Sequence, residues 1–156
     1  MVKRASPDHS PCPVARSLDI IGDWWSLLII RDALEGVRRF NAFQASLGIA
    51  KGMLAIRLRA LVERGIFEMA PASDGSAYRE YVLTPKGEAL HIVVAALRQW
   101  GEMQLYGPAE RHSFLADIRD GLAVAPLVLR ASDERTLEWR DTRVVKVSEA
   151  RSRDGG

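Results

Sequence analysis

The stretch Gly36–Arg64, GVRRFNAFQASLGIAKGMLAIRLRALVER, joins a helical hydrophobic pattern to an unusual concentration of positive charge. It holds six cationic side chains and one acid, so its charge is +5, whereas the charge of the whole chain is +2. The cations are Arg38, Arg39, Lys51, Arg57, Arg59 and Arg64, and the acid is Glu63. A basic surface on a pair of helices is typical of nucleic-acid binding. A solvated basic helix face is the alternative interpretation.

Apolar residues recur at spacings of three and four on both sides of Gly48–Ile49. This pattern predicts one helix from about residue 40 to 47 and another from about 51 to 64, joined by a tight turn. The second helix is expected to bury a narrow stripe formed by Leu54, Leu58, Leu61 and Val62.

Two further helices are predicted before this stretch. The first covers residues 14–21, where apolar residues are spaced one helical turn apart, and Gly22 ends it. The second covers residues 23–35 and is apolar nearly all round, including Trp24, which predicts a central, buried helix. Asp23 is a suitable N-cap for this helix.

A short hairpin and a long helix are predicted after the basic stretch. Strands are expected at 66–69 and 78–83, and the turn between them contains the Asp-Gly pair typical of hairpins. A Thr-Pro pair at 84 and 85 then begins one long helix that runs to about Tyr106. The order of elements predicts a winged helix-turn-helix, mainly α with a small antiparallel β-hairpin.

The composition excludes several other classes of protein. The apolar runs are too short for a membrane span, and the N-terminus lacks the apolar segment of a signal peptide, so we expect a cytoplasmic protein. Cys12 is the only cysteine, which excludes an intrachain disulfide and a thiolate-rich zinc site. The three histidines lack ligand spacing, and no nucleophile, base and orienting group are apparent. We therefore expect no metal, no cofactor and no enzymatic activity.

Several strings resemble the HxlR family of bacterial transcription regulators, which are relatives of the MarR type. They are CPV at 12–14, IIGDWWSLLIIRDALEGVRRFNAF at 20–43, GIAKGMLAIRLRALVERG at 48–65, EYVLTPKGEAL at 80–90 and LRQWGE at 97–102. The resemblance implies a homodimer held by the N-terminal and long C-terminal helices. It also implies two recognition helices that enter successive major grooves of a pseudo-palindromic operator. A repressor is implied more than an activator. A winged helix used only for protein contacts is a weaker hypothesis, because protein interfaces do not need such clustered charge.

The resemblance makes the helix at 51–64 the recognition helix. Lys51 and Gly52 lie at its N-terminus, where the helix dipole and free amides favour a phosphate. On the face opposite the leucine stripe, Ile56 and Met53 are expected to contact thymine methyl groups. Relatives usually have polar residues at the helix start and at position 56. The alternative is that Ile56 packs on a neighbouring element. Few side chains that hydrogen-bond base edges remain on this helix, so much of the specificity is expected from DNA shape.

Six other side chains are candidates for DNA contact. Arg59 lies on the outward face of the helix and suits a phosphate or a guanine edge, while Arg57 lies near the core stripe with its charged end reaching outward. Arg38 and Arg39 precede the helix at 40–47 and are expected to hold backbone phosphates. In the wing, Ser76 and Arg79 are weaker candidates, because Asp74 at the tip opposes DNA electrostatically.

Cys12 matches the N-terminal cysteine that senses oxidants or electrophiles in some members of the family. A sensor thiol must be accessible and have a lowered pKa. The alternative is a small apolar residue buried in a dimer interface. The second functional hypothesis is therefore a ligand- or redox-responsive sensor, with a small-molecule effector pocket at the dimer interface or with Cys12 as the reactive thiol.

The sequence predicts four segments. Residues 1–12 form a flexible arm, 13–107 the winged-helix domain, 108–150 a small β-rich extension and 151–156 a disordered tail. Strands are expected in the extension at 125–130 and 137–147. Longer relatives resemble this layout but carry a cysteine-containing hairpin like a zinc ribbon, whereas this extension has no cysteine. The partners that we expect are double-stranded DNA and a second copy of the chain.

Overall fold

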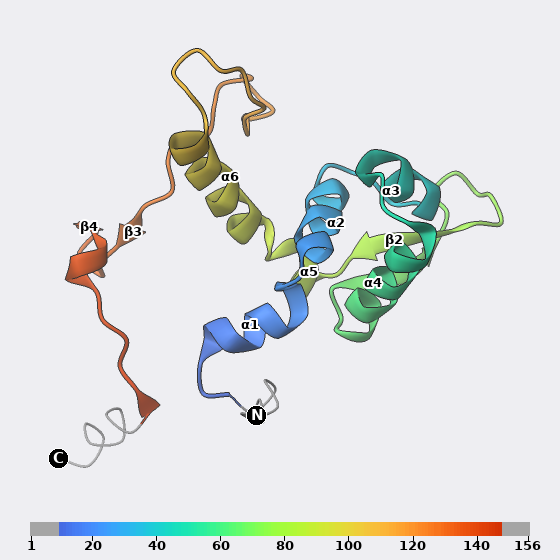
Figure 1. Cartoon of the computed structure of the whole chain (residues 1–156), viewed down its shortest axis with the longest axis horizontal. Helices are drawn as coiled ribbons and strands as arrows, with labels where there is room; N and C mark the ends of the chain where they lie inside the picture. The colour runs from blue at the N-terminus through green and yellow to red at the C-terminus, as the bar shows by residue number, and fades with distance from the viewer. Residues whose placement is uncertain (1–9, 148–156) are drawn as a thin grey trace. The chain divides into compact units, whose positions relative to one another are not determined.

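The computed structural model describes residues 10–147 (Figure 1). The predicted tail at 151–156 and residues 1–9 of the predicted arm lie outside the described residues. The chain divides into two compact units between Leu97 and Arg98, and the domain bounds inferred from the sequence remain predictions. No helix among residues 10–147 is long and apolar enough to cross a membrane.

Four helices open the first unit, and their bounds agree with the predicted ones to within one residue. They are α1 Pro13–Ile21, α2 Trp24–Leu34, α3 Phe40–Leu47 and α4 Lys51–Glu63. Asp23 caps α2 as predicted, because its carboxylate accepts hydrogen bonds from the amides of Trp25 and Ser26. The prediction that α2 is buried all round is wrong at Trp24, which is 76% exposed. Trp24 lies on the opposite side of the helix from the buried Ile29 and Ile30, so it faces solvent.

The core lies where α2, α3 and α4 meet the hairpin. The predicted leucine stripe of α4 is confirmed, because Leu54, Leu58 and Leu61 are fully buried. The Phe43 ring of α3 meets the Phe67 ring edge to face, with the ring centroids 6.2 Å apart. One side of α4 is therefore held against the core, and its opposite side is left to solvent.

The wing is an antiparallel hairpin of β1 Phe67–Pro71 and β2 Arg79–Leu83. The predicted Asp-Gly turn is confirmed, because Gly75 adopts the left-handed conformation with φ of 74°. The Tyr81 amide donates a hydrogen bond to the Arg38 carbonyl oxygen, 2.8 Å away. This bond joins the hairpin to the loop that leads into α3, so the wing and the start of α3 belong to one surface.

The long helix predicted from residue 85 to 106 is wrong, because the structure has two helices, α5 Pro85–Glu88 and α6 His91–Leu105. The Thr84 hydroxyl donates to the Gly65 carbonyl oxygen and accepts from the Gly87 amide, so α5 is anchored on the turn after α4. The Leu90 amide then bonds the carbonyl oxygen of Gly87, three residues back, and the helical hydrogen bonding changes there.

The second unit contains little regular structure in its described part. The strands expected at 125–130 and 137–147 are largely wrong, because β3 spans only Leu129–Arg130 and β4 only Thr136–Leu137. A 3₁₀ helix, η2 Trp139–Asp141, follows β4 at once, and reciprocal hydrogen bonds between Glu138 and Asp141 cap it. No residue from 98 to 147 is fully buried.

Close packing at Gly87 generates a stability prediction. A Cβ added there would lie 2.3 Å from the Ile66 carbonyl oxygen. We therefore expect Gly87→Ala to lower the free energy of unfolding by about 1–3 kcal/mol in urea titrations. Gly52→Ala is the matched control, because a Cβ at that helical position meets nothing within 4 Å. The control should be neutral or stabilising by up to about 1 kcal/mol. Equal stability of the Gly87→Ala and wild-type proteins would contradict this packing.

Candidate nucleic-acid interface

The outward face of α4 is open to solvent. Ile56 is 59% exposed and Met53 is 38% exposed, while Lys51, Gly52 and Arg59 are also exposed. Within residues 10–147, Ile56 is therefore not packed on a neighbouring element of its own chain, and its contact with DNA stays a prediction. The face presents an apolar centre flanked by two cations, which suits the edge of a base pair and its adjoining phosphates.

The positive charge of the basic stretch is partly neutralised by acids from elsewhere in the chain. Four of its six cations form ion pairs, which are Arg38–Glu80, Arg39–Asp74 and Arg39–Glu80, Arg57–Asp23, and Arg64–Asp19. Within residues 10–147, Lys51 and Arg59 have no ion-pair partner. The charge along the sequence therefore overstates the charge that the folded surface offers to DNA.

Arg57 lies where the sequence places it, but its charged end turns inward. Its Nε lies 3.4 Å from Oδ1 of Asp23, the residue that caps α2, and its side chain is 34% exposed. This ion pair ties α4 to the N-terminus of α2. A contact between Arg57 and DNA stays a prediction.

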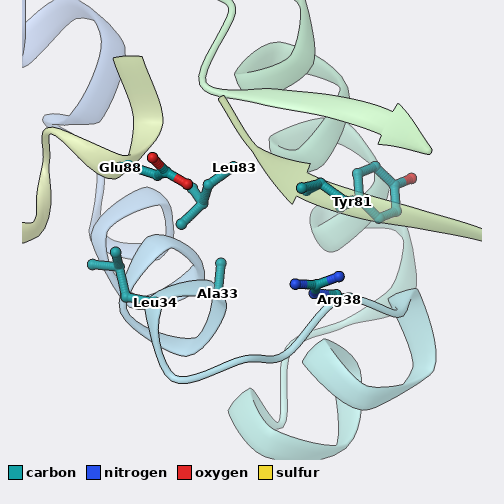
Figure 2. A pocket seen from close by; sticks show the side chains of 7 residues that line it. Ala33, Leu34, Arg38, Tyr81, Leu83 and Glu88 are labelled. Carbon is teal, nitrogen blue, oxygen red and sulfur yellow. The ribbon is translucent and has the colours of Figure 1, made fainter. Parts of the chain in front are cut away.

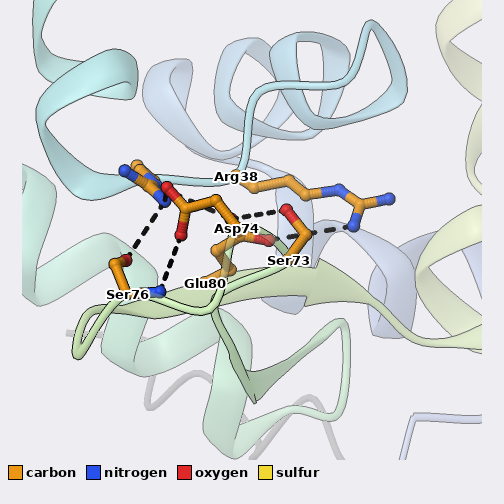
Figure 3. Close-up of polar contacts among 6 residues, drawn as sticks. Arg38, Ser73, Asp74, Ser76 and Glu80 are labelled. Atoms are coloured by element: carbon orange, nitrogen blue, oxygen red, sulfur yellow. Dashed lines mark hydrogen bonds and ion pairs between the residues drawn. The ribbon is translucent and has the colours of Figure 1, made fainter.

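Glu80 organises the loop before α3, although the sequence analysis assigned it no role beyond its place in the family pattern. Its side chain is 5% exposed, and its Oε1 accepts a hydrogen bond from the Ser73 hydroxyl at 3.1 Å (Figure 3). Arg38 Nη1 lies 3.8 Å from Oε2, and Arg39 Nε lies 3.6 Å from Oε1. A buried carboxylate between two arginines is well compensated. The sequence shows one acid on β2 and a pair of arginines before α3. Their contact could not be predicted, because only the fold brings these two segments together.

The wing tip folds back onto Arg39. Arg39 Nη2 lies 2.5 Å from Asp74 Oδ2 and 3.4 Å from the Ser76 hydroxyl, and the Ser76 amide donates to Asp74 Oδ1 at 3.0 Å (Figure 3). Hydrogen bonds from Ser76, and then the one from Arg39, lower the pKa of Asp74 to about 2. Asp74 in turn raises the pKa of the Arg39 guanidinium. The tip therefore neutralises a cation that the sequence assigned to DNA.

The other wing candidates lie along the same hairpin. Arg79 is exposed, and its Nη2 donates to the Met69 carbonyl oxygen at 3.1 Å. Ser76 is half-buried beside Arg39. Their contacts with DNA stay predictions.

A small cavity lies beside the wing, between α2, β2 and α5. Its volume is about 190 Å³. It is lined by Ala33, Leu34, Arg38, Tyr81, Val82, Leu83 and Glu88. Figure 2 shows the Arg38 guanidinium directed into it from one side and the Glu88 carboxylate from another. Only a molecule of a few heavy atoms fits such a space.

Cys12 is the N-cap residue of α1 and is exposed. Its amide donates to the Ser10 hydroxyl at 3.2 Å, and the Arg16 amide donates to its carbonyl oxygen at 3.2 Å. Within residues 10–147, no group of three His, Cys, Asp or Glu side chains is placed to hold a metal ion.

Comparison with known proteins gives consistent matches. A family model described as HxlR-like helix-turn-helix matches residues 20–108, more than half of the chain. The HTH-type transcriptional regulator Rv3095 of Mycobacterium tuberculosis is 43% identical over 95 residues, which cover 61% of this chain and 60% of that protein. The chain thus spans about three-fifths of the length of that relative.

Two solved structures extend the comparison. The crystal structure of PA1607, described as a candidate transcription factor, shares 50% identity and a TM-score of 0.85 over 90% of this chain and 99% of that one. The redox regulator HypR in its reduced form shares 30% identity and a TM-score of 0.53 over 59% of this chain and 92% of its own.

The contacts of Asp74 generate a pH prediction. Because its pKa is lowered in the folded protein, the contact stabilises the wing above the ordinary value of 3.8 and is lost as the pH falls toward 2. The side-chain carbonyl ¹³C shift of Asp74 should titrate with a midpoint of about 2. Arg39→Gln should raise this midpoint only in part, because the bonds from Ser76 remain. An ordinary midpoint in the wild-type protein would show that the tip is not docked in solution.

Proposed function

The chain belongs to the HxlR-like helix-turn-helix family of DNA-binding transcriptional regulators, and we propose that it is a sequence-specific repressor that binds duplex DNA as a homodimer in the cytoplasm. The observation that carries this proposal is the exposed face of α4, where Ile56 lies between unpaired cations and opposite a fully buried leucine stripe. A helix held rigidly on one side and open on the other suits insertion into a major groove.

In this proposal the outward face of α4 contacts the base edges in the major groove. Lys51 and the Gly52 amide hold a phosphate at the helix N-terminus, and Arg59 holds a second phosphate or a guanine edge. Ile56 and Met53 contact thymine methyl groups. Few hydrogen-bonding side chains face outward, so DNA shape contributes the rest of the specificity.

The surrounding residues hold the DNA backbone. Arg38 and Arg39 bind phosphates from the loop before α3, while Arg57, Ser76 and Arg79 extend the contact surface around α4 and the wing. Such contacts supply affinity and register without direct sequence information.

The exposed apolar surface of two helices supports the homodimer. On α1, Val14 is 65% exposed and Leu18 is 57% exposed. On α6, the exposed apolar residues include Leu97 at 50% and Trp100 at 56%. Exposed apolar side chains of this size are typical of protein interfaces, and a second copy would cover them.

A redox-responsive regulator is the second candidate function. The exposure of Cys12 favours it, because an oxidant can reach the thiol, and one of the similar structures is described as a redox regulator. In this hypothesis, a disulfide between the Cys12 residues of two chains or a mixed disulfide with a small thiol changes DNA binding. A small-molecule effector at the dimer interface is the remaining alternative.

Selection from a random duplex library, with and without a thiol oxidant, tests the main proposal. The reduced protein should enrich an inverted repeat with half-sites about one helical turn apart. Ile56→Gln should enrich a different sequence while its affinity for random DNA stays close to that of the wild-type protein. No enrichment in either condition would contradict sequence-specific binding, and enrichment only after oxidation would favour the redox hypothesis. Identical sequences from both proteins would contradict the role of Ile56.

The dimer proposal is tested by placing a charge on α6. Trp100→Glu should convert a dimer into a monomer of 17.3 kDa in sedimentation equilibrium, because an unpaired carboxylate would be buried at the interface. Trp24→Glu is the matched control, since Trp24 is also exposed and lies on α2. The control should keep the dimer. A dimeric Trp100→Glu protein would remove this part of α6 from the interface.

A further inference from the structure

We propose that Asp74 occupies, in the DNA-free protein, the site on Arg39 and Ser76 that a backbone phosphate takes in the complex. The wing tip then carries an internal competitor for DNA. This inference rests on the proposed function, and it assigns a role to an acid that the contact predictions left unexplained.

The donors around Asp74 form a site for an anion with two oxygens. Arg39 Nη2 contacts Oδ2 at 2.5 Å, and the Ser76 amide donates to Oδ1 at 3.0 Å. The Ser76 hydroxyl lies 3.4 Å from the same Arg39 nitrogen, so the two residues hold the Asp74 carboxylate together (Figure 3). Arginine with backbone and hydroxyl donors is the usual set that binds the free oxygens of a DNA phosphate.

Arg39 is held in place by groups other than Asp74. Its Nε lies 3.6 Å from the buried Glu80 carboxylate, and its guanidinium lies 6.0 Å from the centre of the Tyr78 ring. Ser73 in turn holds Glu80. When Asp74 leaves, the guanidinium therefore keeps its position, and DNA binding does not have to fix the Arg39 side chain at a further cost in entropy.

Asp74 itself can leave at small cost. Its side chain is 54% exposed at the tip of a loop, and an exposed ion pair contributes little to stability because water replaces the partner. The hydrogen bond from the Ser76 amide is also given up, and the phosphate accepts it in place of Asp74. Loop tips are also the mobile part of a hairpin. Rotation of one carboxylate into solvent is thus sufficient to open the site.

The exchange has an electrostatic reason. Arg39 immediately precedes α3, and the wing is bonded to the same loop through the Tyr81 amide. A carboxylate at this place would face the phosphates of DNA held by α3 and α4. In the free protein Arg39 neutralises that carboxylate, and in the complex a phosphate competes for the same guanidinium. Asp74 therefore weakens binding to every duplex, whatever its sequence.

Binding of the full-length protein to a random-sequence duplex, measured by fluorescence anisotropy at low salt, tests this exchange. Asp74→Asn should tighten binding by about two- to fivefold, the range that an exposed ion pair supports. Asparagine retains the side-chain oxygen that accepts from the Ser76 amide, so the turn should persist. Asp74→Ser, which can also accept there, should give the same gain and repeats the test with a second side chain.

Asp133→Asn is the matched control for the change in net charge. Asp133 is 65% exposed and pairs with Arg135 at 3.5 Å within the second unit. Its substitution should change affinity less than Asp74→Asn does. In an Arg39→Gln background, the gain from Asp74→Asn should shrink to that of the control, because no shared cation remains.

The outcomes separate the inference from the proposed function. An equal gain in both backgrounds would mean simple repulsion of DNA by Asp74 and would overturn the exchange at Arg39. Unchanged or weaker binding by Asp74→Asn would mean that Asp74 is neutral or positions Arg39 for DNA, and it would also overturn the inference. Both results leave the proposed function intact. Absence of duplex binding by the wild-type protein and every variant would reject both.

Discussion

The burial of one leucine stripe determines how this chain presents α4. Leu54, Leu58 and Leu61 are fully buried against the core formed with α2, α3 and the hairpin. Burying such side chains contributes roughly 1.5–3 kcal/mol each, so the rotation of the helix about its axis is strongly specified. The direction of every outward side chain of α4 depends on that rotation. The exposure of Ile56 and Arg59 follows from the same packing that hides the leucines.

A second constraint is the compensation of arginine charge by acids distant in sequence. Asp19, Asp23, Asp74 and Glu80 come from four different places and meet cations of the basic stretch. The pairs have different roles. The pair of Arg57 joins α4 to α2, whereas the pair of Arg39 is formed with a carboxylate at an exposed loop tip. The folded surface therefore offers DNA a smaller and more localised positive charge than the sequence suggests. For the sequence-specific regulator that we propose, a modest nonspecific affinity would favour discrimination between sites.

Local patterns explain which predictions succeeded. The bounds of α3 and α4 follow from apolar periodicity and from glycines after the last turn, and these signals lie within the elements themselves. The hairpin followed from the Asp-Gly turn signal, and the family resemblance added the recognition role of the helix at 51–64. The break between α5 and α6 could not be seen, because the sequence continues a helical apolar pattern across it, whereas the structure ends α5 at Glu88 and begins α6 at His91. The same holds for Glu80, whose burial requires two arginines from another element. Site residues chosen by face were exposed as expected, while the partners of Arg39 and Arg57 depended on the fold.

The exposure of residues 98–147 has a thermodynamic consequence. A segment with no fully buried residue gains little hydrophobic free energy to offset the conformational entropy lost on ordering. Its backbone amides are expected to exchange with solvent far faster than those of the core helices. If a second chain covers this segment, the free energy of ordering the segment becomes part of the free energy of dimerisation. Association then has a large negative heat-capacity change. The midpoint of thermal unfolding then rises with protein concentration, so the amount of regulator in the cell would also set how much of it is fully folded.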